Sequence, residues 1–493
     1  MTGTIHFETL GCRLNHDESE GAARFFSESG FTVDMNPLTA ASPVDRDVVL
    51  AVINTCTVTG KAEQKARRII RLMLEKFPVA LVIVTGCYAA LDGELLCAIS
   101  TERISIIPGT GKFVLSLLPT AMVAGGDLCI AEGLFRHDRL DVFIQRKLSS
   151  SASPLLVPPI RRKAPPVNAF TLYTNVFQKH SRATLKLQDG CNCECSYCRI
   201  HLARGASVSL PLDEAVRRAR KLEETGVTEA VLTGVNLSQW RGEDGQGRSV
   251  GLASLVEGLL EGTDRIFFRL SSLYPESVDE KLCAVLAHPR VQPFFHLSIQ
   301  SGSDRILQAM RRPHSLSHVD RAIARLREIK ENPFISCDII AGFPGESEED
   351  FAATKALCEK RSFAWIHAFP FSARPGTPAM SMKGQVPESV KGERVAWLTR
   401  KAVEGKISYA GQWEGRTLQA VVEHSRSQGP GVLHAVTGNY LHVECPLPDG
   451  AGRGGEANGE GPASGSLVNL VIGRCLEDSI ASGGELDCLG TLA

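Results

Sequence analysis

Three cysteines lie in one short run, QDGCNCECSYCRI, at positions Cys191, Cys195 and Cys198. Three thiolates from a single loop can ligate three irons of a cubane [4Fe–4S] cluster and leave the fourth iron open to a small molecule. A structural zinc site would need a second ligand pair at characteristic spacing, which this stretch lacks, although His201 lies close by. Cys193, inside the run, is either a spectator or a competing ligand.

Three further cysteines each follow a predicted strand near the amino terminus: Cys12, Cys56 and Cys87. The strands expected before them are Ile5–Leu10, Val48–Ile53 and Leu81–Thr85, with a basic amphipathic helix at Gly60–Lys76. Ligands of open parallel sheets bind beyond the carboxyl ends of the strands, so these thiols can converge on a second cluster. Buried cysteine acting as a small apolar residue is the alternative interpretation.

Composition limits the class of protein. The chain has 493 residues, 15 cysteines and a formal net charge of −1. This length predicts several domains, and the near-zero charge means that any RNA binding comes from local basic patches. We find neither a secretory signal nor an apolar run long enough to cross a bilayer. We therefore expect a cytoplasmic protein with no membrane association, in which clustered thiols stay reduced and serve metal binding or catalysis.

The elements that must position these thiols predict an α/β multidomain protein. Alternating strands and helices indicate an open α/β domain first, then a Ser/Pro-rich linker, then a partial (β/α)6 barrel whose first strand precedes the Cys191–Cys198 loop. Short β-branched segments near the carboxyl end indicate a small β-barrel, interrupted by a low-complexity stretch at Gly450–Gly465. The predicted boundaries are 1–145, 146–180, 181–410 and 411–480, followed by a tail at 481–493.

One apparent motif is set aside. Pro108 to Lys112 (PGTGK) looks like part of a phosphate-binding loop, but the required upstream glycine and the Ser or Thr after the lysine are replaced by Ile106 and Phe113. We predict a turn that leads into a helix.

The combined motifs resemble the radical-SAM methylthiotransferases, most closely the MtaB-type enzymes that modify N6-threonylcarbamoyladenosine in tRNA. The resemblance covers nearly the whole chain. It is carried by TLGCRLNHDESE, VINTCTVTGKAEQKARRIIR, VTGCYAAL, QDGCNCECSYCRI, LARG, VLTGVNLSQW, HLSIQSGSDRILQAMRR and DIIAGFPGESEEDF. The carboxyl segment resembles the TRAM domain, an RNA-binding β-barrel of this family.

The resemblance implies roles for particular residues. Cys191, Cys195 and Cys198 would hold the cluster that cleaves S-adenosylmethionine (SAM), and Cys12, Cys56 and Cys87 an auxiliary [4Fe–4S] cluster flanked by Asn15 and Asn54. The positions that would contact SAM are Tyr197, Thr233, Gly234, Asn236, Gln300, Ser301, Gly302 and Gly342. For each of these, a turn between strand and helix is the alternative interpretation. The chain departs from the family pattern at Arg199, His201, Ser207 and Val208.

The implied reaction is the transfer of a methylthio group to carbon 2 of the modified adenosine next to the anticodon. It would use two SAM molecules, a sulfur donor and a low-potential electron donor of the flavodoxin or ferredoxin type, and the enzyme would be a monomer. The implied partner is the tRNA anticodon stem-loop, whose unpaired bases can be splayed out. Candidate phosphate contacts are Arg67, Arg68, Arg71, Arg311, Arg312 and the run Arg161–Lys163, each of which is otherwise a solvated surface charge.

Alternatives remain open at this stage. Isopentenyladenosine in tRNA or an aspartate of a ribosomal protein could be the substrate of the same fold and chemistry. A non-catalytic RNA-binding iron–sulfur protein is a different class, but simple binding would not need the open iron of the Cys191–Cys198 loop.

Overall fold

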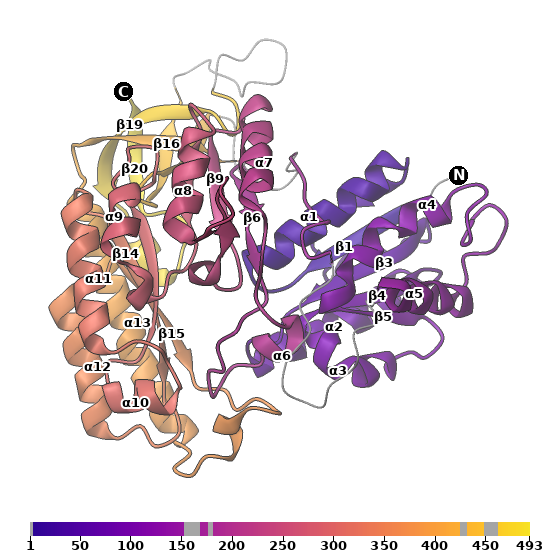
Figure 1. The fold of residues 1–493 in the computed structure, drawn as a ribbon, viewed down its shortest axis with the longest axis horizontal. Coiled ribbons are helices and arrows are strands. Elements are labelled where there is room, and N and C mark those ends of the chain that lie inside the picture. Colours follow the sequence, from indigo (N-terminus) through magenta and orange to yellow (C-terminus); the bar gives the residue numbers. More distant parts are fainter. Residues whose placement is uncertain (1–2, 152–167, 176–180, 424–430, 448–461) are drawn as a thin grey trace.

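The computed structural model describes residues 3–151, 168–175, 181–423, 431–447 and 462–493. Figure 1 shows the amino-terminal part of the chain on one side and the central and carboxyl-terminal parts on the other. The Arg161–Lys163 run and most of the Gly450–Gly465 stretch lie outside the described residues.

The amino-terminal domain is built on a five-stranded parallel sheet in the order β2-β1-β3-β4-β5. Its strands are β1 (Thr4–Thr9), β2 (Thr32–Asp34), β3 (Val48–Thr55), β4 (Leu81–Gly86) and β5 (Ile104–Pro108). The central strands β3 and β4 are almost entirely buried, which explains their unbroken apolar runs. The predicted open α/β domain is therefore present.

Helices cover both faces of this sheet. The helical elements are α1 (Arg13–Glu28), α2 (Gly60–Lys76), α3 (Cys87–Cys97), η1 (Gly109–Ser116), α4 (Leu118–Met122) and α5 (His137–Ser151). Apolar side chains of α1, η1, α4 and α5 share one core, and those of α2 and α3 share the other. Helix α5 continues past residue 145, so the domain ends later than the predicted boundary.

The central domain contains six parallel strands in two three-stranded sheets, β12-β9-β6 and β13-β14-β15. Bridges between Phe268 and Val291 and between Leu273 and Leu297 join the two sheets into one curved wall. The strands are β6 (Ala183–Lys186), β9 (Glu229–Thr233), β12 (Phe267–Leu270), β13 (Phe294–Gln300), β14 (Phe334–Ala341) and β15 (Trp365–Pro370). This confirms the partial barrel.

Helices pack outside this wall over a core of Leu, Ile, Val and Phe side chains. They are α7 (Leu212–Glu224), α8 (Leu252–Glu261), α9 (Glu280–Leu286), α11 (Leu316–Ile329), α12 (Glu348–Arg361) and α13 (Glu388–Gly411). The short α6 (Ile200–Arg204) packs on α3 of the first domain, and α10 (Asp304–Ala309) belongs to a separate small apolar cluster. Two small antiparallel pairs follow β6 and β9: β7 (Gln188–Asp189) with β8 (Val208–Ser209), and β10 (Gly242–Glu243) with β11 (Ser249–Val250). The cysteine loop and α6 lie between β7 and β8.

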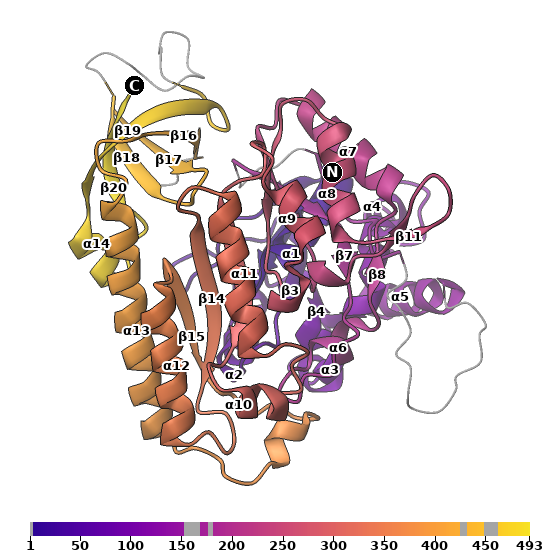
Figure 2. The ribbon, with the colours of Figure 1, turned by 60° about the vertical axis from the view of Figure 1, so that its left-hand side comes forward.

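The long helix α13 leads from the central domain into a closed five-stranded barrel, β16-β17-β18-β20-β19 (Figure 2). Its strands are β16 (Thr417–Val422), β17 (Val432–Thr437), β18 (His442–Pro446), β19 (Leu467–Cys475) and β20 (Cys488–Leu492), with α14 (Glu477–Ser482) between the last two. The predicted tail at 481–493 is wrong, because β20 closes the barrel by pairing with both β18 and β19. Within the described residues, no helix is long and apolar enough to cross a membrane.

Candidate active site between the amino-terminal domain and the barrel

The Cys191–Cys198 loop is held by the segment that follows α10. The backbone N–H of Ser196 donates to the carbonyl oxygen of Met310 at 3.0 Å, and its hydroxyl donates to that of Ala309 at 2.8 Å. Because Ser196 is fully buried, these bonds fix the loop at its middle.

The start of the loop depends on a glycine. Gly190 has φ of +69°, and a Cβ atom there would lie 2.0 Å from the carbonyl oxygen of Ala206. Only glycine allows this close approach at positive φ. The next residue, Cys191, donates its N–H to the carbonyl oxygen of Gly205 at 3.0 Å, so the loop is closed against the turn after α6.

Each of the three thiols in this loop has a polar neighbour. Arg312 lies beside Cys195, with 3.5 Å between Nη1 and Sγ, and the N–H of Ile200 donates to Sγ of Cys198 at 3.4 Å. Burial raises the pKa of Cys198 to about 11, and the neighbouring thiol of Cys195 adds to the rise. Three thiols this near to one another repel as anions, so they need a cationic group among them to ionise together.

The donor set fits an iron–sulfur cluster better than a single metal ion. In the part of the chain that the structure describes, no three His, Cys, Asp or Glu side chains converge as the ligands of one metal ion. A cubane does not need such convergence, because its thiolates bind separate irons, and the sequence near this loop lacks the second ligand pair of a structural zinc site. All fifteen cysteines are free, so no disulfide competes.

Cys193 points toward other partners. Gln239 Nε2 donates to its Sγ at 3.0 Å, and Asn236 Nδ2 lies 3.8 Å from the same atom. A hydrogen bond to Cys191, followed by burial, raises the pKa of the Cys193 thiol and keeps it protonated. The same bond lowers the pKa of Cys191. Cys193 therefore acts here as a hydrogen-bonding neighbour of a predicted ligand.

Thr233, Gly234 and Asn236 lie where β9 ends, beside the cysteine loop. The N–H of Asn236 donates to Gln188 Oε1 at 2.8 Å, and a Cβ atom on Gly234 would lie 2.9 Å from the same glutamine side chain. The carboxyl ends of β6 and β9 are thus brought together, as a cofactor pocket on this edge requires.

Gln300 is the last residue of β13, and Ser301 and Gly302 follow it. Gln300 has φ of +77°, a conformation that non-glycine residues rarely adopt. Ser301 is fully buried, and a Cβ atom on Gly302 would lie 2.4 Å from Cα of Thr354 on α12. Ser301 and Gly302 therefore serve the packing of this turn, while strain at Gln300 marks the strand end that faces the predicted site.

Gly342 lies at the end of β14 in the second sheet, and Tyr197 lies within the cysteine loop. Gly342 follows β14 with φ of +75°, and its N–H donates to Glu346 Oε2 at 2.6 Å. Tyr197 packs against the apolar cluster of Phe343 and Phe371. Burial raises the pKa of the Tyr197 hydroxyl, which remains protonated.

The three amino-terminal cysteines come together at one edge of the first sheet. Cys12 follows β1, Cys56 follows β3 and Cys87 begins α3 after β4, and these three strands are neighbours in the sheet. A Cβ atom on Gly11 would lie 2.9 Å from Sγ of Cys56, which explains the glycine before Cys12. Burial raises the pKa of Cys56 to about 11, and the nearby Cys87 and Cys12 thiols add to it.

Two asparagines hold the loops around these cysteines. Asn15 Nδ2 donates to the carbonyl oxygens of Leu10 at 2.9 Å and Thr55 at 3.2 Å, which ties α1 to the ends of β1 and β3. Asn54 Nδ2 donates back to the carbonyl oxygen of Asn15 at 2.9 Å. The two asparagines therefore hold each other's segments in place and have a structural role.

The two cysteine groups face each other across the domain boundary, where α6 packs on α3 (Figures 1 and 2). Arg204, at the end of α6, donates from Nε to Sγ of Cys87 at 3.4 Å. Cys87 and Cys198 are near enough for their charges to interact. The structure thus places an arginine of the barrel domain against a thiol of the other domain.

Arg204 belongs to a buried polar network that the sequence did not predict. It bonds Glu18 at 2.9 Å, Asp189 at 2.9 Å and Asn15 Oδ1 at 2.7 Å. Lys186 binds Glu18 at 2.7 Å and Asp189 at 2.6 Å, and Lys112 also pairs with Glu18. Burial raises the pKa of Glu18, but these three cations outweigh it and hold the pKa well below its usual value.

The charges of this network do not balance internally. Three cations meet two carboxylates, and the remaining positive charge lies beside Cys87. A thiolate there would be stabilised. Arg204 belongs to the LARG motif and Glu18 to the NHDESE motif, both of which the sequence singles out. Lys112 lies in the PGTGK turn, to which the sequence assigns no function, and η1 begins in this turn as predicted.

A second polar cluster joins the domains beside Cys56. Glu63 on α2 pairs with Arg199 at 3.2 Å and with Arg374, and Arg199 also reaches Asp92 at 3.1 Å. Arg199 is one of the departures from the family pattern, and it is nearly buried here. Its acidic partners on the other domain explain how a charge is accommodated at this position.

The other departures have local roles. The hydroxyl of Ser207 accepts a hydrogen bond from Gln188 Nε2 at 2.8 Å, and its N–H donates to Asn192 at 2.9 Å. Val208 pairs with Asp189 in the β7–β8 hairpin, and His201 lies in α6. Ser207 and Val208 therefore brace the cysteine loop.

The predicted phosphate contacts separate into two groups. Arg68, Arg71 and Arg311 are exposed and available to a polyanion. Arg67 donates to the hydroxyl of Tyr88 at 2.5 Å. The prediction of a phosphate contact at Arg312 is wrong, because this side chain is buried. It donates to the carbonyl oxygen of Ser298 at 2.8 Å and lies over the ring of Tyr274, 4.0 Å from the ring centre.

Comparison with known proteins agrees with this geometry. Residues 185–358 match the radical SAM superfamily, and residues 4–107 match the uncharacterized protein family UPF0004. The radical SAM methyltransferase TsrM of Kitasatospora setae, solved with cobalamin and a [4Fe–4S] cluster, has a similar fold, with a TM-score of 0.52 and 15% identity over 77% of this chain and 74% of that chain.

Curated relatives extend over nearly the full chain. The threonylcarbamoyladenosine tRNA methylthiotransferase MtaB of Treponema pallidum is 43% identical over 95% of this chain and 98% of that protein. The protein of the same name from Bacillus subtilis is 31% identical over 89% and 90% of the two chains. The tRNA-2-methylthio-N(6)-dimethylallyladenosine synthase of Erythrobacter litoralis is 30% identical over 86% and 87%. Identity and coverage of this extent show that the chain belongs to the radical SAM tRNA methylthiotransferases.

Proposed function

We propose that this enzyme transfers a methylthio group to carbon 2 of N6-threonylcarbamoyladenosine in tRNA. The observation that carries this proposal is the meeting of two three-cysteine groups at the domain boundary, in a chain that is 43% identical over 95% of its length to a relative named for this reaction. The Treponema pallidum relative is more similar to this chain than the dimethylallyladenosine synthases, which are 30% and 32% identical. Other relatives named MtaB lie in nearly the same range, at 30–34%.

Membership in the radical SAM superfamily means that the enzyme uses SAM and a [4Fe–4S] cluster. We assign this cluster to Cys191, Cys195 and Cys198, where it would supply the reductive cleavage of SAM. We further propose that Cys12, Cys56 and Cys87 hold a second [4Fe–4S] cluster. The convergence of their strands at one sheet edge, facing the first group, supports this assignment.

The protein's own residues supply position and charge. Ser196 and Gly190 fix the cysteine loop, and Arg312 and Arg204 each place a cation beside one predicted ligand thiol. Fixed charges and hydrogen bonds to the sulfurs tune such centres. We expect tRNA to approach over the small carboxyl-terminal barrel, a monomer to be sufficient, and a low-potential flavodoxin or ferredoxin and a separate sulfur donor to be required.

The test is nucleoside mass spectrometry on tRNA from cells that lack their own methylthiotransferase for threonylcarbamoyladenosine. Intact protein should restore the 2-methylthio nucleoside, and Cys12→Ala should not. Cys97→Ala is the matched control, because Cys97 lies in the same domain but its thiol donates to the carbonyl oxygen of Ile104.

Other results would redirect the assignment. Methylthiolated isopentenyladenosine would keep the chemistry and replace the substrate. No change in any tRNA nucleoside, with both clusters present by iron and sulfide analysis, would favour a ribosomal-protein aspartate. Full activity of Cys191→Ala in the cell would support the non-catalytic RNA-binding alternative.

A further inference from the structure

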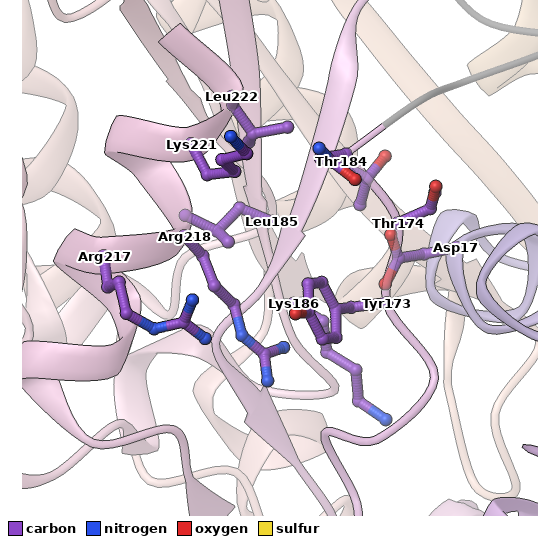
Figure 3. Close-up of a pocket in the computed structure, with 11 residues that line it drawn as sticks. Asp17, Tyr173, Thr174, Thr184, Leu185, Lys186, Arg217, Arg218, Lys221 and Leu222 are labelled. Atoms are coloured by element: carbon purple, nitrogen blue, oxygen red, sulfur yellow. The ribbon is translucent and has the colours of Figure 1, made fainter. Parts of the chain in front are cut away.

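A cavity of about 170 Å³ lies where α1, β6 and α7 meet, apart from the cysteine loops. Figure 3 shows Arg217, Arg218 and Lys221 entering it from α7, with Asp17 on the opposite side from α1. The segment before β6 contributes Tyr173. Asp17 is the one acidic residue among the described residues that line the cavity, against four cations.

The positive charge on the α7 side is only partly neutralised. Arg217 and Arg218 share one carboxylate, Glu214, at 2.6 Å each. Lys221 pairs with Glu224 at 3.2 Å, and both side chains are more than half exposed, so solvent weakens that pair. Lys186 is the fourth cation, and its bonds to Glu18, Asp189 and the carbonyl oxygen of Ala169 leave it no free donor.

Asp17 is the unusual member of the lining. It is 3% exposed, and among the described residues its Oδ2 atom has no hydrogen-bond partner. Burial raises the pKa of the Asp17 carboxyl well above its usual value and outweighs the attraction of Lys186. Burial thus favours the neutral carboxyl, which carries an O–H that can donate to a ligand. A buried polar atom without a partner is costly and calls for an explanation.

Tyr173 holds the cationic side of the cavity in place. The guanidinium carbon of Arg218 lies 3.8 Å from the centre of the Tyr173 ring, and Figure 3 shows this ring between Arg218 and Asp17. Arg218 also donates to the carbonyl oxygen of Phe170 at 3.0 Å. These contacts restrict a side chain that would otherwise lose much entropy on binding a ligand.

We propose that this cavity is a binding site for a phosphate-type oxyanion, with Asp17 as a hydrogen-bond donor at its base and Arg217, Arg218 and Lys221 compensating the charge. The anion is either a free phosphate or a phosphate of an RNA backbone, since both present the same oxygens. The RNA source rests on the proposed function, whereas the free-phosphate source does not.

The first experiment measures binding of inorganic phosphate to the purified protein by isothermal titration calorimetry, at constant ionic strength set with chloride. The variants are Asp17→Ala, Asp17→Asn and the double variant Arg217→Gln with Lys221→Gln. Arg220→Gln is the matched control: it is on the same helix, lies outside this cavity and donates to the carbonyl oxygen of Gly262. Melting temperatures of all variants, measured without phosphate, separate lost binding from lost folding.

For a free-phosphate site, Asp17→Ala and the double variant should each bind phosphate about tenfold more weakly, the loss expected when a hydrogen bond to an ion is removed. Asp17→Asn keeps a donor and should bind at least as tightly as the intact protein. Arg220→Gln should be unchanged.

The second experiment measures the affinity for an anticodon stem-loop RNA by fluorescence anisotropy over a series of salt concentrations. If the RNA backbone is the source of the phosphate, calorimetry should detect little binding of inorganic phosphate. The double variant should then weaken RNA binding and lower the slope of affinity against salt concentration by about one phosphate contact or more, and Arg220→Gln should have a smaller effect. If neither phosphate nor RNA distinguishes the cavity variants from Arg220→Gln, the proposal is overturned. Methylthiolation of tRNA by the intact protein, assayed separately, reports on the proposed function independently of either result.

Discussion

Arg204 of the barrel domain donates a hydrogen bond from Nε to Sγ of Cys87 in the amino-terminal domain, over 3.4 Å. The rest of the same guanidinium bonds Glu18 and Asn15 of α1, which follows Cys12, and Asp189, which lies two residues before Cys191. This one buried side chain thus links the two domains and places a positive charge near a predicted cluster ligand. A buried polar network of this kind stabilises the protein only when all of its members have hydrogen-bond partners.

Replacing Arg204 should therefore destabilise the domain interface. We expect Arg204→Gln to lower the free energy of unfolding by about 3 kcal/mol, because it breaks buried ion pairs with Glu18 and Asp189. The remaining pairs of these carboxylates with Lys186 and Lys112 keep the loss at the low end for a buried pair. Thermal melts of the cluster-free protein would measure this, and Arg204→Gln combined with Glu18→Gln should cost less than the sum of the two single changes. Arg248→Gln, which breaks a mostly exposed pair with Asp244, is the control and should change little. Additive effects would show that the network is not a unit.

Gly190 should be essential for the loop that carries Cys191. Alanine there would meet the carbonyl oxygen of Ala206 at 2.0 Å and would need a positive φ. With the two [4Fe–4S] clusters proposed above, Gly190→Ala should lose about four irons per chain after reconstitution, because only the loop of the barrel domain is disturbed. Iron and sulfide analysis would measure this. Gly245→Ala, where the added Cβ meets nothing within 4 Å, should keep the full iron content.

The fold was predictable where a pattern is local. Helix α2 has the predicted bounds Gly60–Lys76, because its apolar residues repeat at helical spacing and Thr59 caps it. The partial barrel was also predictable from local patterns, since each of its six strands is a short apolar run between turn residues. The convergence of Cys12, Cys56 and Cys87 followed from strand order alone, as parallel strands end at one edge of a sheet.

What could not be predicted depends on pairing between distant segments. Lys112 and Glu18 are far apart in the sequence, and neither spacing nor composition indicates that they meet. Arg312 was assigned to the surface because a charged residue usually lies there, whereas its partners Ser298 and Cys195 come from other elements. The sequence predicts a tail where β20 lies, because a short strand beside glycines gives little signal without its neighbours.

Arg312 should tune the centre held by the Cys191–Cys198 loop. Its Nη1 atom lies 3.5 Å from Sγ of Cys195, so Arg312→Gln removes a positive charge beside a predicted ligand. We expect a lower reduction potential of that cluster and activity reduced about 10–100-fold. Redox titration followed by electron paramagnetic resonance would measure the potential. Arg311→Gln, at the exposed neighbouring position, should leave it unchanged; an equal shift in both variants would contradict a specific role.

Asp17 gives the stability of the protein a distinct pH dependence. Burial raises the folded-state pKa of its carboxyl above the reference value of 3.8, so the folded protein binds a proton that the unfolded chain has released. Stability is therefore lost as pH rises from about 4 toward the folded pKa. Asp17→Asn removes this loss and should raise the melting temperature at pH 7.5 by about 2–4 °C, on the order of 1 kcal/mol, with a smaller effect at pH 4.5. Asp264→Asn, at an exposed position, is the control. A pH-independent gain would indicate that the variant acts through packing, and a loss at pH 7.5 would mean that the carboxylate is charged and paired in the folded state.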